Sequence, residues 1–241
     1  DFEEIGREVS ENAIKKLNSR KIKTCKSDVI FDSKVSSSIL RNLFTACNAQ
    51  AIIKGTSFLK NKIENQIFNR NISIVDDPLM EKRLRSRITD CEGIESKRKY
   101  LVERGDLKFF FNSLSSAKQI DQDPTGHASR SVSSIPSISF SNLFMENGNC
   151  SRKDLIKSMN NGLLITELMG SSINYSNGDY SRGASGFWIE NGEICYPVSE
   201  ITIAGNLNKM FESLLPANDL EFNFAVNAPS CLIENLTLGG K

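Results

Sequence analysis

The single histidine, His127, is the first residue to test for acid–base or metal chemistry. One histidine excludes a two-histidine zinc site and the HExxH class within this chain. It also leaves a single candidate base for any Ser–His or Cys–His scheme. Because His127 stands in a stretch rich in Pro, Gly and Ser, we predict a solvated loop residue there.

Cysteines and carboxylates offer the other routes to chemistry. The six cysteines are widely separated and contain no CxxC pair, so we expect small buried hydrophobes of a reducing compartment. A cytoplasmic location is therefore expected. Neighbouring acids occur at Asp76-Asp77 and at Glu190 with Glu193, but acid catalysis requires two carboxyl groups that face one another in a cleft. The sequence contains neither GxxxxGK[ST] nor GxSxG.

Charge and hydropathy limit the partners. Lys and Arg number 30 and Asp and Glu number 29, so the net charge is +1. A balance this even produces no long-range field toward nucleic acid or acidic membranes, and we expect no direct nucleic-acid contact. No apolar run approaches the ~18 residues of a membrane span, so no membrane partner is expected.

The glycines of Gly183–Gly186 lie in a predicted strand. Glycine inside a strand often marks a place where another backbone or a ligand approaches closely. A second chain adding to this strand by main-chain hydrogen bonds is one interpretation, and close packing within the protein is the other.

The helices and strands predicted from the sequence indicate one α+β domain over residues 1–241, which consists mainly of antiparallel β-sheet with flanking helices. Turns at Asn177-Gly178 and Asn191-Gly192 predict an antiparallel meander. Segment 121–150 is rich in Ser, Pro, Gly and Asn and predicts a long loop of the kind that is often mobile. Helices are predicted over 3–20, 36–53, 151–161 and 207–215, and strands over 28–31, 71–75, 163–169, 180–190, 193–198, 201–204, 219–224 and 231–238.

One long motif resembles a known family. It runs from Thr166-Glu167-Leu168-Met169-Gly170 through the stretch from Gly178 to Ile194, which contains Gly-Asp-Tyr-Ser-Arg-Gly-Ala-Ser-Gly-Phe-Trp, to Leu207. This motif is similar to the hallmark of the PmbA (TldE) type of the TldD/PmbA metalloproteases, a family also labelled modulators of DNA gyrase. The resemblance spans essentially the whole chain and implies the C-terminal domain of a longer protein whose N-terminal domain is absent here.

The resemblance implies a division of labour between two subunit types. TldD-type chains carry an HExxxH motif on a helix, whereas PmbA-type chains lack it. At the matching positions this sequence has Arg41, Asn42 and Ala46. Arginine repels a dication and alanine has no donor atom. We therefore expect no catalytic residue, no metal ligand and no cofactor in this chain, with zinc in a TldD-type partner.

The expected function is that of the non-metal-binding subunit of a complex that processes or degrades unfolded peptides. The expected partner is a TldD-type chain in a heterodimer, or a second copy in a homodimer. The candidate residues for substrate or partner binding are Asn174, Asp179, Tyr180, Arg182 and Trp188.

Two alternatives stay open at this point. A non-enzymatic modulator of DNA gyrase would bind gyrase with no TldD-type chain present. A self-sufficient homodimeric hydrolase would keep peptidase activity in a chelator. The sequence offers no nucleophile–base pair that favours the latter.

Overall fold

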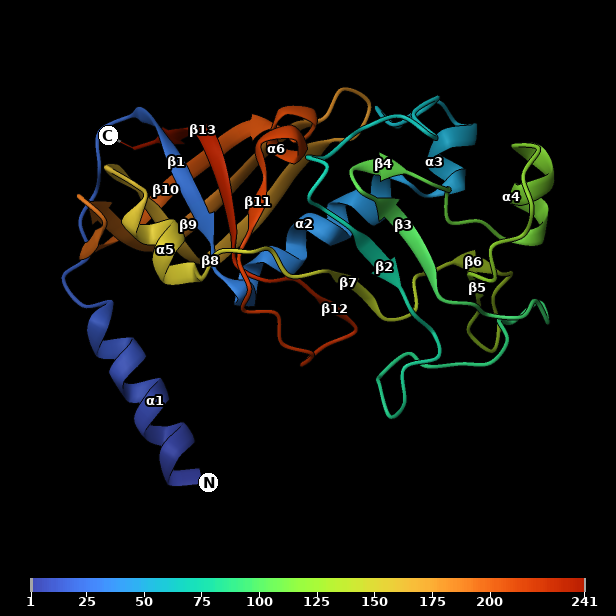
Figure 1. Ribbon diagram of the computed structural model, residues 1–241, viewed down its shortest axis with the longest axis horizontal. Helices are drawn as coiled ribbons and strands as arrows, with labels where there is room; N and C mark the ends of the chain where they lie inside the picture. Colours follow the sequence, from blue (N-terminus) through green and yellow to red (C-terminus); the bar gives the residue numbers. More distant parts are fainter. Residues whose placement is uncertain (1, 241) are drawn as a thin grey trace.

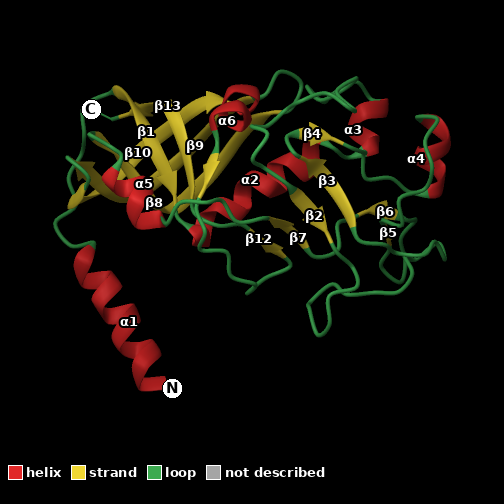
Figure 2. Cartoon of the chain, in the orientation of Figure 1, coloured by secondary structure: helices red, strands yellow, loops and turns green. Residues whose placement is uncertain are grey.

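The computed structural model describes residues 2–240 and confirms the α+β class (Figures 1 and 2). One large sheet and a second sheet of short strands lie on either side of a central helix. The helices are α1 (Phe2–Lys15), α2 (Ser33–Ala46), α3 (Ala49–Ile53), α4 (Leu114–Gln119), α5 (Arg152–Lys157) and α6 (Leu207–Ser213). The strands are β1 (Cys25–Phe31), β2 (Ile74–Asp76), β3 (Lys99–Glu103), β4 (Asp106–Leu107), β5 (Ala128–Ser129), β6 (Ser137–Ile138), β7 (Leu143–Met145), β8 (Asn161–Asn174), β9 (Asp179–Glu190), β10 (Glu193–Asn206), β11 (Leu215–Pro216), β12 (Val226–Asn227) and β13 (Cys231–Gly239).

The large sheet has the strand order β1-β8-β9-β10-β13-β11, and β1 also pairs with β13. Strands β1, β8, β9, β10 and β13 therefore pair in a closed cycle. All of these pairings are antiparallel except β1 with β8, which is parallel. The sheet is thus mixed, as is the smaller one, in which β12 runs parallel to β7. The prediction of a mainly antiparallel sheet holds with these two exceptions.

Two tight turns create the meander of β8, β9 and β10. Gly178 has φ +85°, Asn191 has φ 50° and Gly192 has φ 78°. Left-handed values suit Asn and Gly, so the local turn chemistry dictates both hairpins, as predicted. Strand β10 is continuous where two strands were predicted. A register shift between Val198 and Ile201, with Glu200 at φ 54°, interrupts the regular pairing. The sequence pattern therefore predicted a break between two strands at this place.

Helix α2 lies between the two sheets and contacts β1, β8, β7 and β12 (Figure 1). Asp32 begins the helix, because its side chain accepts a hydrogen bond from the backbone N–H of Lys34. The helix predicted over 36–53 is interrupted, since Asn48 caps α3 in the same way through the N–H of Gln50. Ile39, Leu40 and Leu43 are buried and anchor α2 in the main core.

Segment 121–150 is more structured than a long loop. It contains β5, β6 and β7, and β7 pairs with both β2 and β12. Residues 219–224, in contrast, form no strand and lead irregularly into β12. The first difference arises from pairing between segments far apart in the sequence, which local patterns do not report. In the second, the backbone N–H groups of Asn223 and Phe224 donate to the side chain of Asn227 and not to a neighbouring strand.

Helix α1 extends away from the rest of the chain (Figure 1). It ends earlier than predicted, and its apolar residues are uncovered: Ile5 is 58% exposed and Val9 63%. Across residues 2–240, none of the helices has both the length and the apolar character needed to cross a membrane.

Candidate functional site

The three positions of α2 that we expect to match the metal-binding motif differ in their surroundings. Arg41 is exposed, whereas Asn42 is 7% exposed and Ala46 is fully buried. The amide oxygen of Asn42 accepts a hydrogen bond from the Tyr175 hydroxyl at 3.1 Å. The carbonyl of Ala46 accepts a hydrogen bond from the Ser57 hydroxyl at 2.6 Å. Helix α2 is therefore enclosed on this side by the β8–β9 turn and by the loop after α3.

These residues do not fit a zinc ion. Zinc in proteins takes thiolate, imidazole or carboxylate ligands. Here the amide oxygen of Asn42 is already engaged by Tyr175, Ala46 has no donor atom, and Arg41 carries a permanent positive charge. Over residues 2–240, no three side chains of the His, Cys, Asp or Glu type cluster as metal ligands would.

Asn174 and Asp179, both predicted for binding, flank the turn between β8 and β9. Oδ1 of Asn174 accepts a hydrogen bond from the N–H of Ser176 at 3.0 Å. The Asp179 carboxylate accepts from the side-chain amides of Asn177 at 2.7 Å and Asn206 at 3.2 Å. Both side chains are exposed and also shape the turn. The turn itself contacts α2, because Tyr175, which lies between Asn174 and Asp179 in the sequence, donates a hydrogen bond to Asn42.

Tyr180 and Arg182 share one face of β9. Tyr180 is 2% exposed, and its hydroxyl makes no hydrogen bond of good geometry among the described residues, although the Arg182 guanidinium lies close enough to interact with it. Burial raises the pKa of Tyr180 to about 12, against the opposing effect of the Arg182 guanidinium. Arg182 donates from Nε to the carbonyl of Gly170 at 2.8 Å, which holds the irregular part of β8.

Trp188 lies near the other end of β9, opposite Leu163 and Tyr196. It is half-buried against the main core. At ~3.3 Å per strand residue, Trp188 is roughly 30 Å from Asp179 along β9. The five residues predicted for binding therefore do not form one site. Asn174, Asp179, Tyr180 and Arg182 lie toward the turn that contacts α2, and Trp188 does not.

The Tyr180→Phe variant is expected to keep or increase the stability of the fold. Removing a buried hydroxyl that makes no well-formed hydrogen bond relieves a desolvation cost of about 1–2 kcal/mol, which the lost attraction to Arg182 offsets in part. Urea denaturation followed by circular dichroism measures the change in the free energy of unfolding. A loss above about 1 kcal/mol would mean that the hydroxyl makes a stabilising hydrogen bond.

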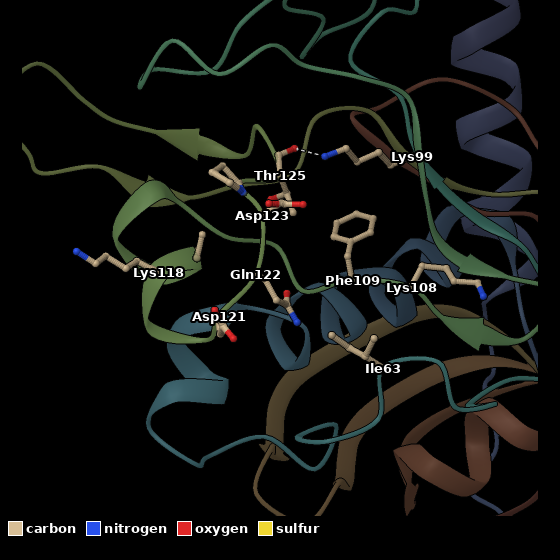
Figure 3. A pocket seen from close by; sticks show the side chains of 11 residues that line it. Ile63, Lys99, Lys108, Phe109, Lys118, Asp121, Gln122, Asp123 and Thr125 are labelled. Carbon is tan, nitrogen blue, oxygen red and sulfur yellow. Dashed lines mark hydrogen bonds between the residues drawn. The ribbon is translucent and has the colours of Figure 1, made fainter.

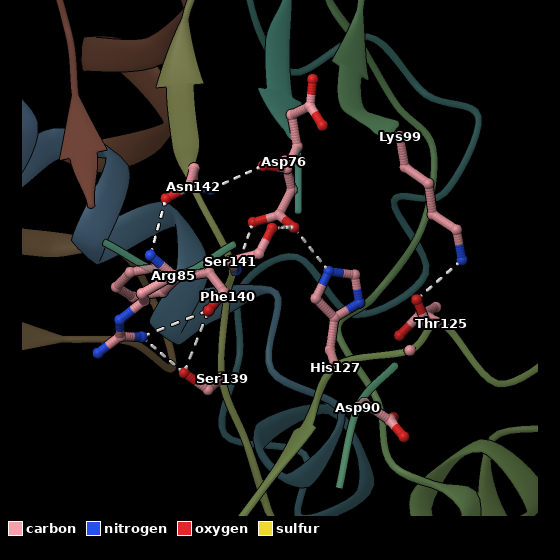
Figure 4. A network of polar contacts seen from close by, with 12 residues as sticks. Asp76, Arg85, Asp90, Lys99, Thr125, His127, Ser139, Phe140, Ser141 and Asn142 are labelled. Atoms are coloured by element: carbon pink, nitrogen blue, oxygen red, sulfur yellow. Dashed lines mark hydrogen bonds and ion pairs between the residues drawn. The ribbon is translucent and has the colours of Figure 1, made fainter. Parts of the chain in front are cut away.

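The prediction that His127 is a solvated loop residue is wrong. His127 is 2% exposed, and its Nε2 lies 2.9 Å from Oδ2 of Asp76, at the end of β2 (Figure 4). Its ring stacks on Phe109 with centroids 5.7 Å apart and meets Phe111 edge-on at 4.7 Å. No local pattern indicates this pairing, because His127 and Asp76 come from separate segments of the chain.

Asp76 is the centre of this buried network. Oδ1 of Asp76 accepts the backbone N–H of Ser141 at 2.8 Å, and Oδ2 accepts the hydroxyl of Ser141 (Figure 4). In a Ser–His–Asp triad the histidine lies between the serine and the acid. Here the acid lies between serine and histidine, and Ser141 is fully buried. The arrangement fastens segment 121–150 to β2 and has no exposed nucleophile.

A cavity of about 620 Å³ lies beside this network (Figure 3). Phe109, whose ring stacks on His127, forms part of its wall. Lys99 donates from Nζ to the carbonyl of Thr125 at 2.9 Å, and burial lowers the pKa of Lys99. The remaining charged groups are of both signs, Lys108 and Lys118 with Asp121 and Asp123. This mixture of charges specifies no class of ligand.

The interpretation of Gly183–Gly186 as an open strand is wrong. Strand β9 lies inside the sheet and pairs with β8 on one side and β10 on the other. A Cβ at Gly186 would lie 1.9 Å from the carbonyl oxygen of Leu164, so this glycine admits the neighbouring strand β8. Beyond Ile165, where β1 ends its pairing, residues 166–174 of β8 pair only with β9 within the described chain.

Comparison with known proteins gives a consistent result. Residues 24–240 match the family described as PmbA/TldA metallopeptidase C-terminal domain. A metalloprotease PmbA homolog from Buchnera aphidicola subsp. Baizongia pistaciae is 35% identical over 99% of this chain and 52% of its own length. Metalloprotease PmbA from Escherichia coli O157:H7 is 33% identical over 98% of this chain and 51% of its own length. The chain thus spans about half the length of these relatives.

Solved structures share the same fold. A proposed modulator of DNA gyrase from Bacteroides thetaiotaomicron superimposes with a TM-score of 0.88 at 32% identity, over 98% of this chain and 52% of that one. TldE from Thermococcus kodakarensis gives a TM-score of 0.85 at 27% identity, over 97% of this chain and 55% of that one.

Proposed function

Because the chain belongs to the TldD/PmbA metallopeptidase family, we propose that it is part of the subunit that holds no metal in a two-subunit protease. In this proposal the zinc site lies in a TldD-type partner, and the complex processes or degrades unfolded peptides in the cytoplasm. This chain contributes subunit surface and the wall of a cleft.

The observation that carries this proposal is the environment of α2. Ala46 is fully buried and Asn42 is bonded to Tyr175, so both positions pack as core and not as ligands. A side chain with a metal-binding head at position 46 would require the core to open. Packing therefore supports the same conclusion as the residue types.

The free edge of β8 supports a role in peptide binding. A strand edge presents unpaired N–H and C=O groups, to which an extended peptide can add whatever its side chains. Residues 166–174 of β8 offer such an edge, whereas β9 does not. This edge replaces Gly183–Gly186 as the place where we expect an unfolded chain to approach.

Co-expression with a TldD-type chain from the same genome tests the proposal, with the full-length protein as the second subunit. We expect the two to co-purify and to cleave an unfolded peptide in a zinc-dependent manner. The control is a TldD-type chain whose motif histidines are replaced by alanine, which should assemble without activity. Failure of the full-length chains to associate would count against the proposal.

A second candidate function is the modulation of DNA gyrase, which the description of the Bacteroides structure names for that protein. Under this alternative, the full-length protein binds gyrase when no TldD-type chain is present. A pull-down with purified gyrase distinguishes the two, since the protease proposal predicts no retention.

A further inference from the structure

A cavity of about 590 Å³ opens on the outer face of the large sheet, where the end of α1 meets the beginnings of α2 and α5. Three apolar side chains from adjacent strands line it: Leu164 of β8, Phe187 of β9 and Ile194 of β10. Leu164 and Phe187 are a cross-strand pair, so their side chains lie on the same face. This volume is within the range of sites that bind small organic molecules, ~300–1,000 Å³.

The rim of the cavity carries an excess of positive charge. Its cationic residues are Lys15, Lys16, Lys34 and Arg152, and its acidic residues are Asp32 and Glu167. Neither carboxylate is free. Asp32 accepts from Nη2 of Arg152 at 2.8 Å, and Glu167 pairs with Lys16 and accepts from the Ser185 hydroxyl at 2.8 Å. These hydrogen bonds lower the pKa of Glu167 and keep it ionised beside Lys16.

Two buried polar atoms of the lining have no partner within residues 2–240. They are Nε of Arg152, which is a charged donor, and Oγ1 of Thr166, which can donate or accept. Buried polar atoms in folded proteins are nearly always hydrogen-bonded, so two at one cavity require an explanation. Both atoms are closed to water in this structure, so a ligand oxygen reaches them only after a small shift of side chains, whereas the rest of the Arg152 guanidinium is already accessible at the rim. A negatively charged acceptor is the partner that a charged donor favours.

We propose that this cavity binds a carboxylate that carries a bulky apolar group. The carboxylate lies at Arg152 and Thr166, and the apolar group lies against Leu164, Phe187 and Ile194. The apolar lining favours such a ligand over inorganic phosphate, which requires more donors and is more strongly hydrated. Two sources have this chemistry: the C-terminal residue of a peptide, which rests on the proposed function, and a free aromatic or branched acid.

Isothermal titration calorimetry of the full-length protein tests the proposal with defined probes. They are N-acetyl-leucyl-phenylalanine, its C-terminal amide, 4-phenylbutyrate and inorganic phosphate. We expect the peptide acid to bind at least about 10-fold more tightly than its amide, because the amide lacks the charge-assisted hydrogen bonds. A peptide acid that binds better than 4-phenylbutyrate identifies the peptide terminus as the source, and equal affinities identify the free acid. Equal binding of acid and amide, binding of phosphate alone, or no binding would overturn the proposal.

Variants locate the binding to this cavity. Thr166→Val and Arg152→Gln should each weaken binding of the acid about 10-fold. Arg152 also bonds Asp32 at the start of α2, so its replacement could disturb the fold as well as the cavity. Ile194→Glu is therefore a second variant that leaves this bond in place. Ile194 is 49% exposed, so a glutamate there is tolerated by the fold and repels the ligand. Lys153→Gln is the matched control, because Lys153 is the exposed neighbour of Arg152 and does not line the cavity. Unchanged affinity in all three cavity variants would contradict the assignment.

The assay is independent of protease activity, since it needs neither zinc nor a TldD-type chain. Binding of the acid without partner assembly would support the cavity and reject the protease proposal. Assembly with the partner and peptide cleavage, without binding of the acid, would support the protease proposal and reject the cavity.

Discussion

The Asp76→Asn variant is expected to lower the free energy of unfolding by about 2–4 kcal/mol. The change keeps the shape of the side chain but replaces one acceptor oxygen by a donor. Ser141 donates from both its backbone N–H and its hydroxyl to Asp76, and His127 lies 2.9 Å away. With its NH₂ in the place of Oδ1, the amide faces the backbone N–H of Ser141. With its NH₂ in the place of Oδ2, the Ser141 hydroxyl must rotate to accept and His127 must leave Nε2 unprotonated, at a position that is fully buried from water.

Urea denaturation followed by the fluorescence of Trp188, the single tryptophan, measures this loss. Asp121→Asn is the control, since Asp121 is exposed and has φ 53°, a conformation that asparagine tolerates. The control should change stability by less than about 0.5 kcal/mol. If Asp76→Asn were as mild as the control, the buried network would not fasten segment 121–150 to β2.

The Gly186→Ala variant is expected to cost about 3 kcal/mol or more, because the contact it creates is with backbone. The added Cβ would lie 1.9 Å from the Leu164 carbonyl oxygen and 2.9 Å from Cα of Ile165. Strands β8 and β9 would have to separate at the middle of the large sheet. Thermal denaturation should show a lower midpoint and, if the sheet opens, loss of the cooperative transition.

Gly183→Ala is the matched control on the same strand. Its nearest neighbour would be the Met169 carbonyl at 3.3 Å, so a shift of a few tenths of an ångström accommodates the methyl group. We expect a cost of at most about 1 kcal/mol. Equal effects at the two glycines would show that close packing of β8 on β9 does not explain Gly186.

Features set by a few neighbouring residues were predictable from the sequence. The turns at Asn177-Gly178 and Asn191-Gly192 depend on left-handed backbone conformations. The capping box that begins α5 depends on Ser151 and Asp154, which are three positions apart. Features set by long-range pairing were not predictable. The parallel pairing of β1 with β8 and the place of β7 in the second sheet have no local signature.

The same distinction applies to the candidate site. The family resemblance, and no local pattern, singled out Arg41, Asn42 and Ala46, whose residue types include none of the usual zinc ligands. The bond between Asn42 and Tyr175 joins α2 to a distant turn, so only the folded structure reveals it. His127 was misjudged for the same reason, since its partner Asp76 lies 51 positions away. Trp188 belongs to the same sequence motif as the other four candidate residues, but it lies near the opposite end of β9.

Zinc titration of the full-length protein, in the absence of a TldD-type chain, tests most directly whether the side chains of Arg41, Asn42 and Ala46 on α2 can hold a catalytic metal. The account predicts that this subunit alone neither binds zinc tightly nor cleaves an unfolded peptide. It also predicts that replacing Asn42 by Ala leaves the zinc titration unchanged. A stoichiometric, tightly bound zinc ion that depends on α2 and supports peptide cleavage by this subunit alone would contradict it.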